Sequence, residues 1–432
     1  MHLRLLIIAF CIPLLAWSQD TDSSRVPATL TADVPELVGR ETSKSNELTA
    51  AFAFNSIYDS NLQSSRTNRV SDWRFGFAPA IRIDQNRPQL HWDLQYQAEV
   101  SRYRELPVDT QANHQLTASL TYRLTPRFKF RLRQDYLRSM DPFSILEAPI
   151  GSLGVANSPN QTVILPSATR SVITSLADVQ YALSPHSDIG VTGTFIKSEF
   201  TNPEKSLVIS PLSGQTLNGS VYYSAKVSPR SSVGLQYVLA DMSYDHSSAR
   251  VQTNSLLIFT TVGFDDHSSL MLWGGPENAR SRGSLFGGSS TTSSTSKDEW
   301  NPAFGVVYSW VGDRTDFGAT ATKRVSDGGG IMDAVSIISG SFAAGRRFTP
   351  FWTGRTSIAI ARNENLSLSS SSGTLRSIFA TLELERQISS NLRASFSYDR
   401  VYQDGKGTYA AIGSHNRFQL SLRYLISRPL GK

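Results

Sequence analysis

Residues 90–100 read Leu-His-Trp-Asp-Leu-Gln-Tyr-Gln-Ala-Glu-Val, and apolar and polar side chains alternate along this stretch without a break. Successive side chains of a β-strand point to opposite faces, whereas a helix repeats its apolar positions at spacings of three and four. The stretch therefore predicts a strand with one apolar face and one polar face. Residues 116–124, 128–133 and 418–426 show the same alternation.

Eighteen segments of this kind lie between Leu48 and Ile426, and 16 is the other count that the weaker, Gly- and Ala-rich segments allow. Short connections built on Pro and Ser, such as those around Pro126 and Pro185, alternate with longer ones along the whole chain. The longer connections are residues 59–72, 105–112, 141–170, 201–216, 247–252, 277–299, 326–333, 366–375 and 404–414. Short periplasmic turns alternating with long outer loops are typical of a transmembrane antiparallel β-barrel.

Aromatic residues gather at both ends of the predicted strands. Tyr122 and Phe128 flank one short turn, whereas Tyr58 and Trp73 lie at the opposite strand ends. Such rings fit the two girdles that mark the membrane interfaces of a barrel. A secreted soluble β-protein is the alternative, but it would not need long and short connections to alternate. We therefore predict an all-β protein that forms a barrel in the outer membrane of a Gram-negative-type bacterium.

Residues 1–18 have the features of a cleaved signal peptide: Arg4 near the start, an apolar run over residues 5–17, and Ser18 at the expected cleavage site. Residues 19–47 are polar and predict a largely disordered periplasmic segment, which leaves residues 48–432 for the barrel. Cys11, the one cysteine, lies in the apolar run. The mature chain is thus expected to use neither disulfides nor thiol chemistry.

Two local features resemble bacterial outer-membrane porins. Residues 141–170 form the third outer connection, which in classical trimeric porins folds inward and narrows the pore. Residues 58–62, Tyr-Asp-Ser-Asn-Leu, are similar to an aromatic-Asp-x-Asn element in β-barrel porins linked to exopolysaccharide gene clusters. The last strand ends without the terminal aromatic residue that the porin pattern has. The resemblance implies a channel with an inward loop that carries Asp141 and Glu147.

The polar face of the predicted strands carries a group of cations that neighbouring strands would bring together. We predict that these line the pore: Arg74, Arg82, Arg123, Lys129, Arg131, Arg133, Arg393 and Arg423. A basic wall opposite the acids of the third loop would favour anions. The alternative is that these cations are ordinary solvated residues paired with acids on the same strands. Tyr222, Phe379 and Leu176 also fall on the inner face, which indicates partial filling.

Nothing in the sequence places a nucleophile beside a base, so we predict no enzyme activity. The Gly-rich stretches at residues 327–330 and 404–407 are typical of turns and predict neither metal nor cofactor. The chain has 42 Lys and Arg against 36 Asp and Glu, but no basic run of the kind that binds nucleic acid.

The predicted function is a passive porin-like channel for small hydrophilic solutes. One alternative is a barrel for exopolysaccharide export or surface display, and another is a non-conducting structural or adhesive barrel. The expected partners are outer-membrane lipid, the barrel-assembly machinery, and small solutes or polysaccharide, while the sequence leaves the oligomeric state open.

Overall fold

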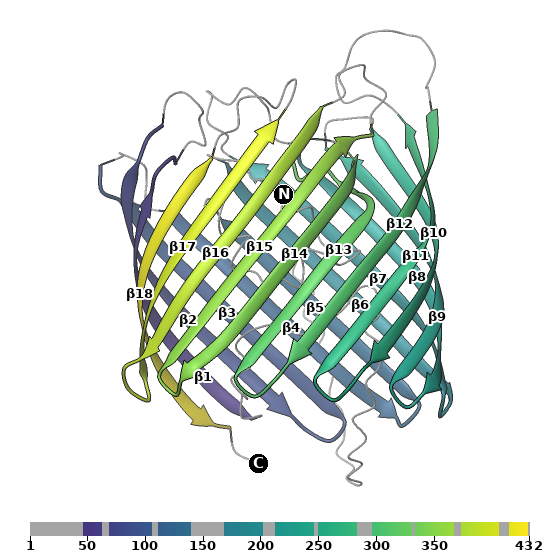
Figure 1. Cartoon of the computed structure of the whole chain (residues 1–432), viewed down its shortest axis with the longest axis horizontal. Coiled ribbons are helices and arrows are strands. Elements are labelled where there is room, and N and C mark those ends of the chain that lie inside the picture. The colour runs from purple at the N-terminus through teal and green to yellow at the C-terminus, as the bar shows by residue number, and fades with distance from the viewer. Residues whose placement is uncertain are drawn as a thin grey trace, which may run out of the picture.

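Eighteen strands close into one antiparallel barrel, which confirms the predicted fold class and the larger strand count. The computed structural model describes residues 46–62, 69–105, 111–139, 168–201, 212–245, 249–282, 296–330, 332, 334–366, 373–405 and 414–430. Each strand pairs with its neighbours in sequence, and β1 also pairs with β18, so the sheet has no free outer strand (Figure 1). The strands are β1 (Glu47–Asp59), β2 (Asp72–Asn86), β3 (Leu90–Tyr103), β4 (Gln111–Thr125), β5 (Phe128–Ser139), β6 (Thr169–Ser184), β7 (Ser187–Thr201), β8 (Gly214–Ser228), β9 (Ser231–Tyr244), β10 (Arg250–Gly263), β11 (Ser268–Arg282), β12 (Ser296–Val311), β13 (Thr315–Asp327), β14 (Ala334–Thr349), β15 (Trp352–Asn365), β16 (Thr374–Gln387), β17 (Leu392–Gly405) and β18 (His415–Pro429).

The outward face of the barrel is apolar around its circumference. On β2, for example, Trp73, Phe75 and Phe77 are exposed, while Arg74 between them is buried on the lumen side. Other exposed outward residues include Phe54, Val191, Leu217, Leu235, Ile258, Ile360, Leu382 and Leu420. Exposed apolar surface on this scale is found where a protein meets lipid, so the strands span a membrane.

The connections at one end of the barrel are tight turns that use the predicted Thr, Ser and Pro residues. Thr125 Oγ1 accepts hydrogen bonds from the backbone N–H groups of Arg127 at 3.3 Å and Phe128 at 3.0 Å. Thr349 does the same at the turn between β14 and β15. β1 begins and β18 ends at this short-turn end, as an even number of strands requires (Figure 1).

The seam between the first and last strands is tied at the long-loop end by residues 58–62. The Asp59 carboxylate accepts a hydrogen bond from the Asn61 backbone N–H at 2.8 Å and lies 3.4 Å from His415 Nδ1 on β18. The Asn61 side-chain amide donates to the Ser414 carbonyl at 2.9 Å. The aromatic-Asp-x-Asn element therefore has a structural task, which is to hold β1 against β18.

One boundary in the wall differs from the other seventeen. The β12–β13 ladder runs from Val311 opposite Asp316 to Phe304 opposite Lys323 and stops there. Both strands continue, β12 to Ser296 and β13 to Asp327, and β13 keeps its pairing with β14 to the end. The outer end of β13 thus leaves β12, while β14 stays paired with β15 as far as Val335 opposite Asn365. The ribbons of β12 and β13 separate toward the long-loop end in Figure 1.

Several predictions fall outside the described residues: the signal peptide, the segment up to residue 45, and residues 140–167 of the third outer connection with Asp141 and Glu147. Among the residues that are described, no helix is long and apolar enough to cross a membrane.

Candidate lumen site

The outer end of β13 turns into the lumen with the start of β14, which stays paired with β15. We call residues 324–330 and 334–337 the inward hairpin. Val325 packs against Met242, Val251 and Ala279, which line the inner wall on β9, β10 and β11. Two residues earlier, Lys323 still pairs with Phe304, whose side chain faces lipid. Alternate residues of a strand share a face, so Val325 is on the same face of β13 as Lys323. This face points toward lipid at Lys323 and toward the inside of the barrel at Val325, so β13 turns inward between these two residues.

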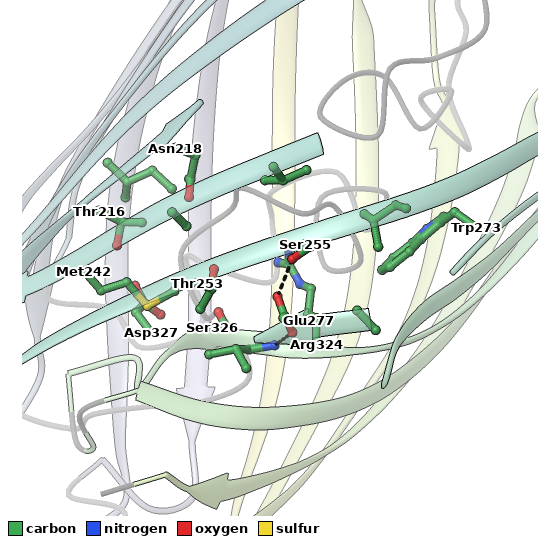
Figure 2. A pocket seen from close by; sticks show the side chains of 16 residues that line it. Thr216, Asn218, Met242, Thr253, Ser255, Trp273, Glu277, Arg324, Ser326 and Asp327 are labelled. Atoms are coloured by element: carbon green, nitrogen blue, oxygen red, sulfur yellow. Dashed lines mark hydrogen bonds between the residues drawn. The ribbon is translucent and has the colours of Figure 1, made fainter. Parts of the chain in front are cut away.

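The Glu277 carboxylate on β11 anchors the inward hairpin. Its Oε2 accepts a hydrogen bond from the Val325 backbone N–H at 2.8 Å, and its Oε1 accepts one from Ser255 Oγ at 3.1 Å (Figure 2). Backbone that leaves a ladder at membrane depth needs another polar partner, and this carboxylate supplies it. Arg324 lies beside Glu277 and is attracted electrostatically to it and to Asp327 (Figure 2).

The hairpin tip reaches the outer ends of β7 and β8. The Gly330 carbonyl accepts a hydrogen bond from the Leu212 backbone N–H at 2.8 Å. Gly330 has φ +89°, and a Cβ added there would collide with the Phe200 ring, so both the turn and the contact favour glycine. The Arg170 guanidinium lies over the same ring, 5.7 Å from its centroid. The inward hairpin therefore follows the inner wall from β11 to β7.

A small cavity of about 50 Å³ lies between the inward hairpin and the inner wall (Figure 2). Apolar side chains, including Trp273, Leu257 and Met242, form part of its lining. Hydroxyl and amide groups, such as those of Ser255 and Asn218, form another part. The cavity is therefore amphipathic, and Glu277 and Arg324 sit within its lining.

Below the hairpin, aromatic rings lie flat on the inner wall over glycines of neighbouring strands. In each case a Cβ added to the glycine would collide with the ring, so only glycine leaves the ring its place. The pairs are Tyr222 over Gly190, Phe259 over Gly234 and Trp273 over Gly305. These rings pack with Leu257 and Ala303 into a buried apolar cluster. We call β7–β11 the aromatic wall.

The remaining inner wall, on β2–β6 and β15–β18, is lined by ion pairs, and we call it the ion-paired wall. Arg131 Nη2 lies 2.9 Å from Asp178 Oδ2, whose other oxygen accepts a hydrogen bond from Thr192 at 2.8 Å. Further pairs are Arg82–Asp93 at 2.8 Å, Arg133–Asp135 at 2.8 Å, Arg355–Glu383 at 3.3 Å, Arg393–Glu385 at 3.6 Å and Arg417–Asp399 at 2.9 Å.

The strand register turns all eight cations predicted for the pore toward the lumen, but it gives them different surroundings. Carboxylates pair with Arg82, Arg131, Arg133 and Arg393. Arg74 is buried near the long-loop end. Near the short-turn end, Arg123 faces Lys129 and Arg423 faces Arg393, so like charges are cross-strand neighbours there. Positive side chains of neighbouring strands are thus close together at that mouth.

Lumen side chains become less accessible from the short-turn end to the long-loop end. Near the short-turn end, Arg82, Arg133 and His91 have exposed side chains. At the long-loop end, buried lumen residues follow one another around the barrel: Asp59, Arg74, Ser101, Asn113, Ser139, Arg170, Asn363, Leu375, Gln403 and His415. Lumen side chains are thus accessible toward the short-turn end and buried toward the long-loop end.

Residues 326–333 were expected to form an ordinary outer loop, and the sequence reasoning missed the inward hairpin. A signal was present in the strand that follows. Residues 334–338, Ala-Val-Ser-Ile-Ile, are apolar on both faces at a strand end where the other strands turn polar. The partial filling predicted from Tyr222 and Phe379 agrees with the burial of both side chains.

A closed barrel of 18 strands with an apolar exterior and a charged lumen defines a transmembrane β-barrel of the kind found in Gram-negative outer membranes. No family model matches the chain, and no curated protein matches it. Solved structures that are similar include OccAB2 of Acinetobacter baumannii, with 12% identity, a TM-score of 0.43, and coverage of 88% of this chain and 98% of that one. OccK5 (OpdH) of Pseudomonas aeruginosa has 15% identity, a TM-score of 0.43, and coverage of 88% and 99%. OpdO of the same organism has 12% identity, a TM-score of 0.43, and coverage of 91% and 98%.

Proposed function

We propose that the protein is a passive channel for small hydrophilic solutes. The observation that carries the proposal is the ion-paired wall, because charged side chains such as Arg82 and Arg133 face a water-accessible lumen behind an apolar exterior. A barrel of 16 to 18 strands is wide enough to leave an aqueous channel. Charged walls favour solutes that can exchange water for polar contacts.

The inward hairpin sets the size limit of the proposed channel. It occupies the lumen beside β7–β11 at the end where the lumen side chains are buried. Solutes would therefore enter a wide vestibule from the periplasmic side and meet the narrowest passage near the outer side. This arrangement favours small solutes and a low conductance. Asp141 and Glu147 stay part of the proposal as acids of the third loop, outside the described residues.

A preference for anions is the proposed consequence of the eight predicted cations. Ion pairing at Arg82, Arg131, Arg133 and Arg393 cancels much of the field along the wall. The positive side chains that are cross-strand neighbours at the short-turn mouth, Arg123 with Lys129 and Arg423 with Arg393, would contribute to the preference there. The preference should therefore be modest and should weaken as salt rises.

A non-conducting surface barrel is the second candidate, and the buried lumen side chains at the long-loop end favour it. A link to exopolysaccharide has less support, because Asp59 and Asn61 already have partners at the seam. We also propose that the protein has no enzyme activity. Residues 1–18 are removed as a signal peptide, and the barrel-assembly machinery inserts the mature chain into the outer membrane.

The test is planar-bilayer recording of the folded mature protein, with the reversal potential measured in a salt gradient. Stable open steps with a reversal potential on the anion side are expected. A cation-side reversal potential would reject the anion preference and leave the channel in place. Absence of conductance from protein shown to be folded would reject the channel and favour the non-conducting barrel.

A further inference from the structure

Ion pairs join outward-facing cations and acids at the long-loop end of β7–β15. On β11 and β12, for example, Arg280 Nε donates to Asp298 Oδ1 at 2.9 Å. Each such pair brings opposite charges together on the lipid-facing surface, so a lipid headgroup meets little net charge there. The pairs are Lys197–Glu199, Arg250–Asp241, Arg280–Asp298 and Arg362–Glu364.

The outward face of β2–β6 has a different charge pattern at the same end. Arg102 on β3 and Arg138 on β5 are exposed there, and His114 lies on β4 between them. We call these three residues the outer basic patch. Along the described lengths of β2–β6, the outward positions carry neither Asp nor Glu. The face that the three basic side chains share therefore offers them no carboxylate from these strands.

The outer basic patch lies at the upper edge of the apolar band. Arg102 is ten residues from Trp92 on β3, and Arg138 is ten residues from Phe128 on β5. Trp92 and Phe128 both face lipid beside the short-turn end. With a rise of ~3.3 Å per residue and a tilt of ~40°, ten residues climb ~25 Å, which is the height of the apolar band. The two arginines therefore lie at one height, at the level of the outer-leaflet headgroups.

Tyr96 holds the His114 ring on this surface. Its hydroxyl lies 3.0 Å from His114 Nδ1, and the two rings are stacked with their centroids 6.3 Å apart. When the hydroxyl donates to Nδ1, neutral His114 carries its proton on Nε2 and can donate there. Arg138 lies directly opposite His114 in the β4–β5 ladder. Basic side chains in this arrangement repel each other when both are charged, and an anion bound between them removes the repulsion.

We propose that the outer basic patch binds a lipid of the outer leaflet whose head carries a phosphate monoester. Arg102 and Arg138 supply two positive charges, which match the charge of ~−2 on such a phosphate at neutral pH. Guanidinium groups bind phosphate oxygens through paired hydrogen bonds, and His114 donates a further one. The acyl chains then contact exposed apolar residues below the patch, such as Val100 and Leu132. The site faces lipid, so it does not depend on the proposed channel.

The experiment counts lipids bound to the whole folded protein in detergent by native mass spectrometry. One probe is dioleoyl phosphatidic acid, which is a phosphate monoester. The other is dioleoyl phosphatidylcholine, which has the same acyl chains and a head without net charge. The wild type is expected to bind phosphatidic acid more tightly than phosphatidylcholine, and the difference should shrink as salt rises.

Two double variants remove the same charge from the same rim of the barrel. Arg102→Gln with Arg138→Gln changes the patch, whereas Arg250→Gln with Arg280→Gln changes two ion-paired cations and serves as the control. All four side chains are exposed, so both proteins should fold. The affinity for phosphatidic acid should fall about 30-fold in the patch variant, since each arginine beside an anionic lipid head is worth about fivefold. The control should stay within about twofold of the wild type, because its cations already have partners.

Three results would overturn the lipid site. Equal affinity of the wild type for the two lipids would show that the phosphate monoester is not recognised. Equal losses in the two double variants would show that the general charge of the rim, and not the patch, attracts the lipid. Displacement of phosphatidic acid by millimolar inorganic phosphate would show that the patch takes free phosphate. Bilayer conductance of the same variants reports on the axial channel separately.

Discussion

The ion-paired wall and the aromatic wall cover the same kind of inner surface in opposite ways. On β2–β6 and β15–β18, charged side chains stand in pairs and several remain accessible to water. On β7–β11, rings lie flat over glycines and the inward hairpin covers the wall beyond them. One barrel can therefore keep part of its inner surface accessible to water and pack another part as an apolar core.

The largest expected effect comes from the buried member of the ion-paired wall. In Arg131→Gln, Asp178 would lose its cation while 0% exposed, and breaking a buried pair in this way costs about 3–5 kcal/mol. Arg133→Gln on the same strand is the control, because Arg133 and Asp135 are 44% and 31% exposed and such pairs contribute about 0–1 kcal/mol. Denaturant unfolding in detergent measures the free energy of unfolding of both variants. Equal losses in Arg131→Gln and Arg133→Gln would contradict the expected difference between the buried and the exposed ion pair.

The aromatic wall should be sensitive to a single methyl group. Gly190→Ala forces the Tyr222 ring off the wall, and overpacking of this kind costs about 1–3 kcal/mol. Gly193→Ala on the same strand is the control, because nothing lies within 4 Å of a Cβ added there. The same unfolding assay should show little change for Gly193→Ala. If Gly193→Ala lowered the free energy of unfolding as much as Gly190→Ala, contact with the Tyr222 ring would not be the reason that position 190 requires glycine.

Releasing the inward hairpin should have a smaller effect on stability. Glu277→Leu removes the acceptor of the Val325 N–H and the anion beside Arg324, and the net loss is about 1 kcal/mol because both groups regain water as the hairpin opens. The single-channel conductance should rise at the same time. Glu277→Gln keeps an oxygen acceptor for the Val325 N–H but loses the charge beside Arg324, so its conductance should lie between those of the wild type and Glu277→Leu. An unchanged conductance in Glu277→Leu would show that the hairpin does not narrow the channel.

The smallest expected effect concerns selectivity. Arg123→Gln together with Arg423→Gln removes two positive charges from the short-turn mouth and should move the reversal potential toward zero. Arg82→Gln with Asp93→Asn removes one opposite-charged pair and serves as the control. A larger shift in the control than in the mouth variant would place selectivity in the wall instead.

Period-two alternation, together with the alternation of short and long connections, was enough to predict the barrel and its strand number. The same alternation was enough to predict which face of each strand carries the eight cations, because each strand needs one face for lipid and one for the lumen. Partners such as Asp178 for Arg131 could not be predicted, since they depend on the register between strands far apart in sequence. The inward hairpin escaped prediction for another reason. β13 keeps strand alternation up to Lys323, and the apolar stretch at residues 334–338 does not by itself show that the following residues of β13 leave β12; the end of the β12–β13 ladder does.

The outer end of β13 lies inside the barrel and not in the wall. Cross-linking of two alternative cysteine pairs tests this placement most directly. The expected mature chain has no cysteine, so pairs can be introduced cleanly. Val325→Cys with Ala279→Cys joins the hairpin to the inner wall of β11, whereas Val325→Cys with Pro302→Cys joins the residues that would pair if the β12–β13 ladder continued. Oxidation of membrane-embedded protein, followed on a gel, is predicted to cross-link the first pair and leave the second reduced. Efficient cross-linking of the second pair alone would contradict the account, because β13 would then complete the wall beside β12.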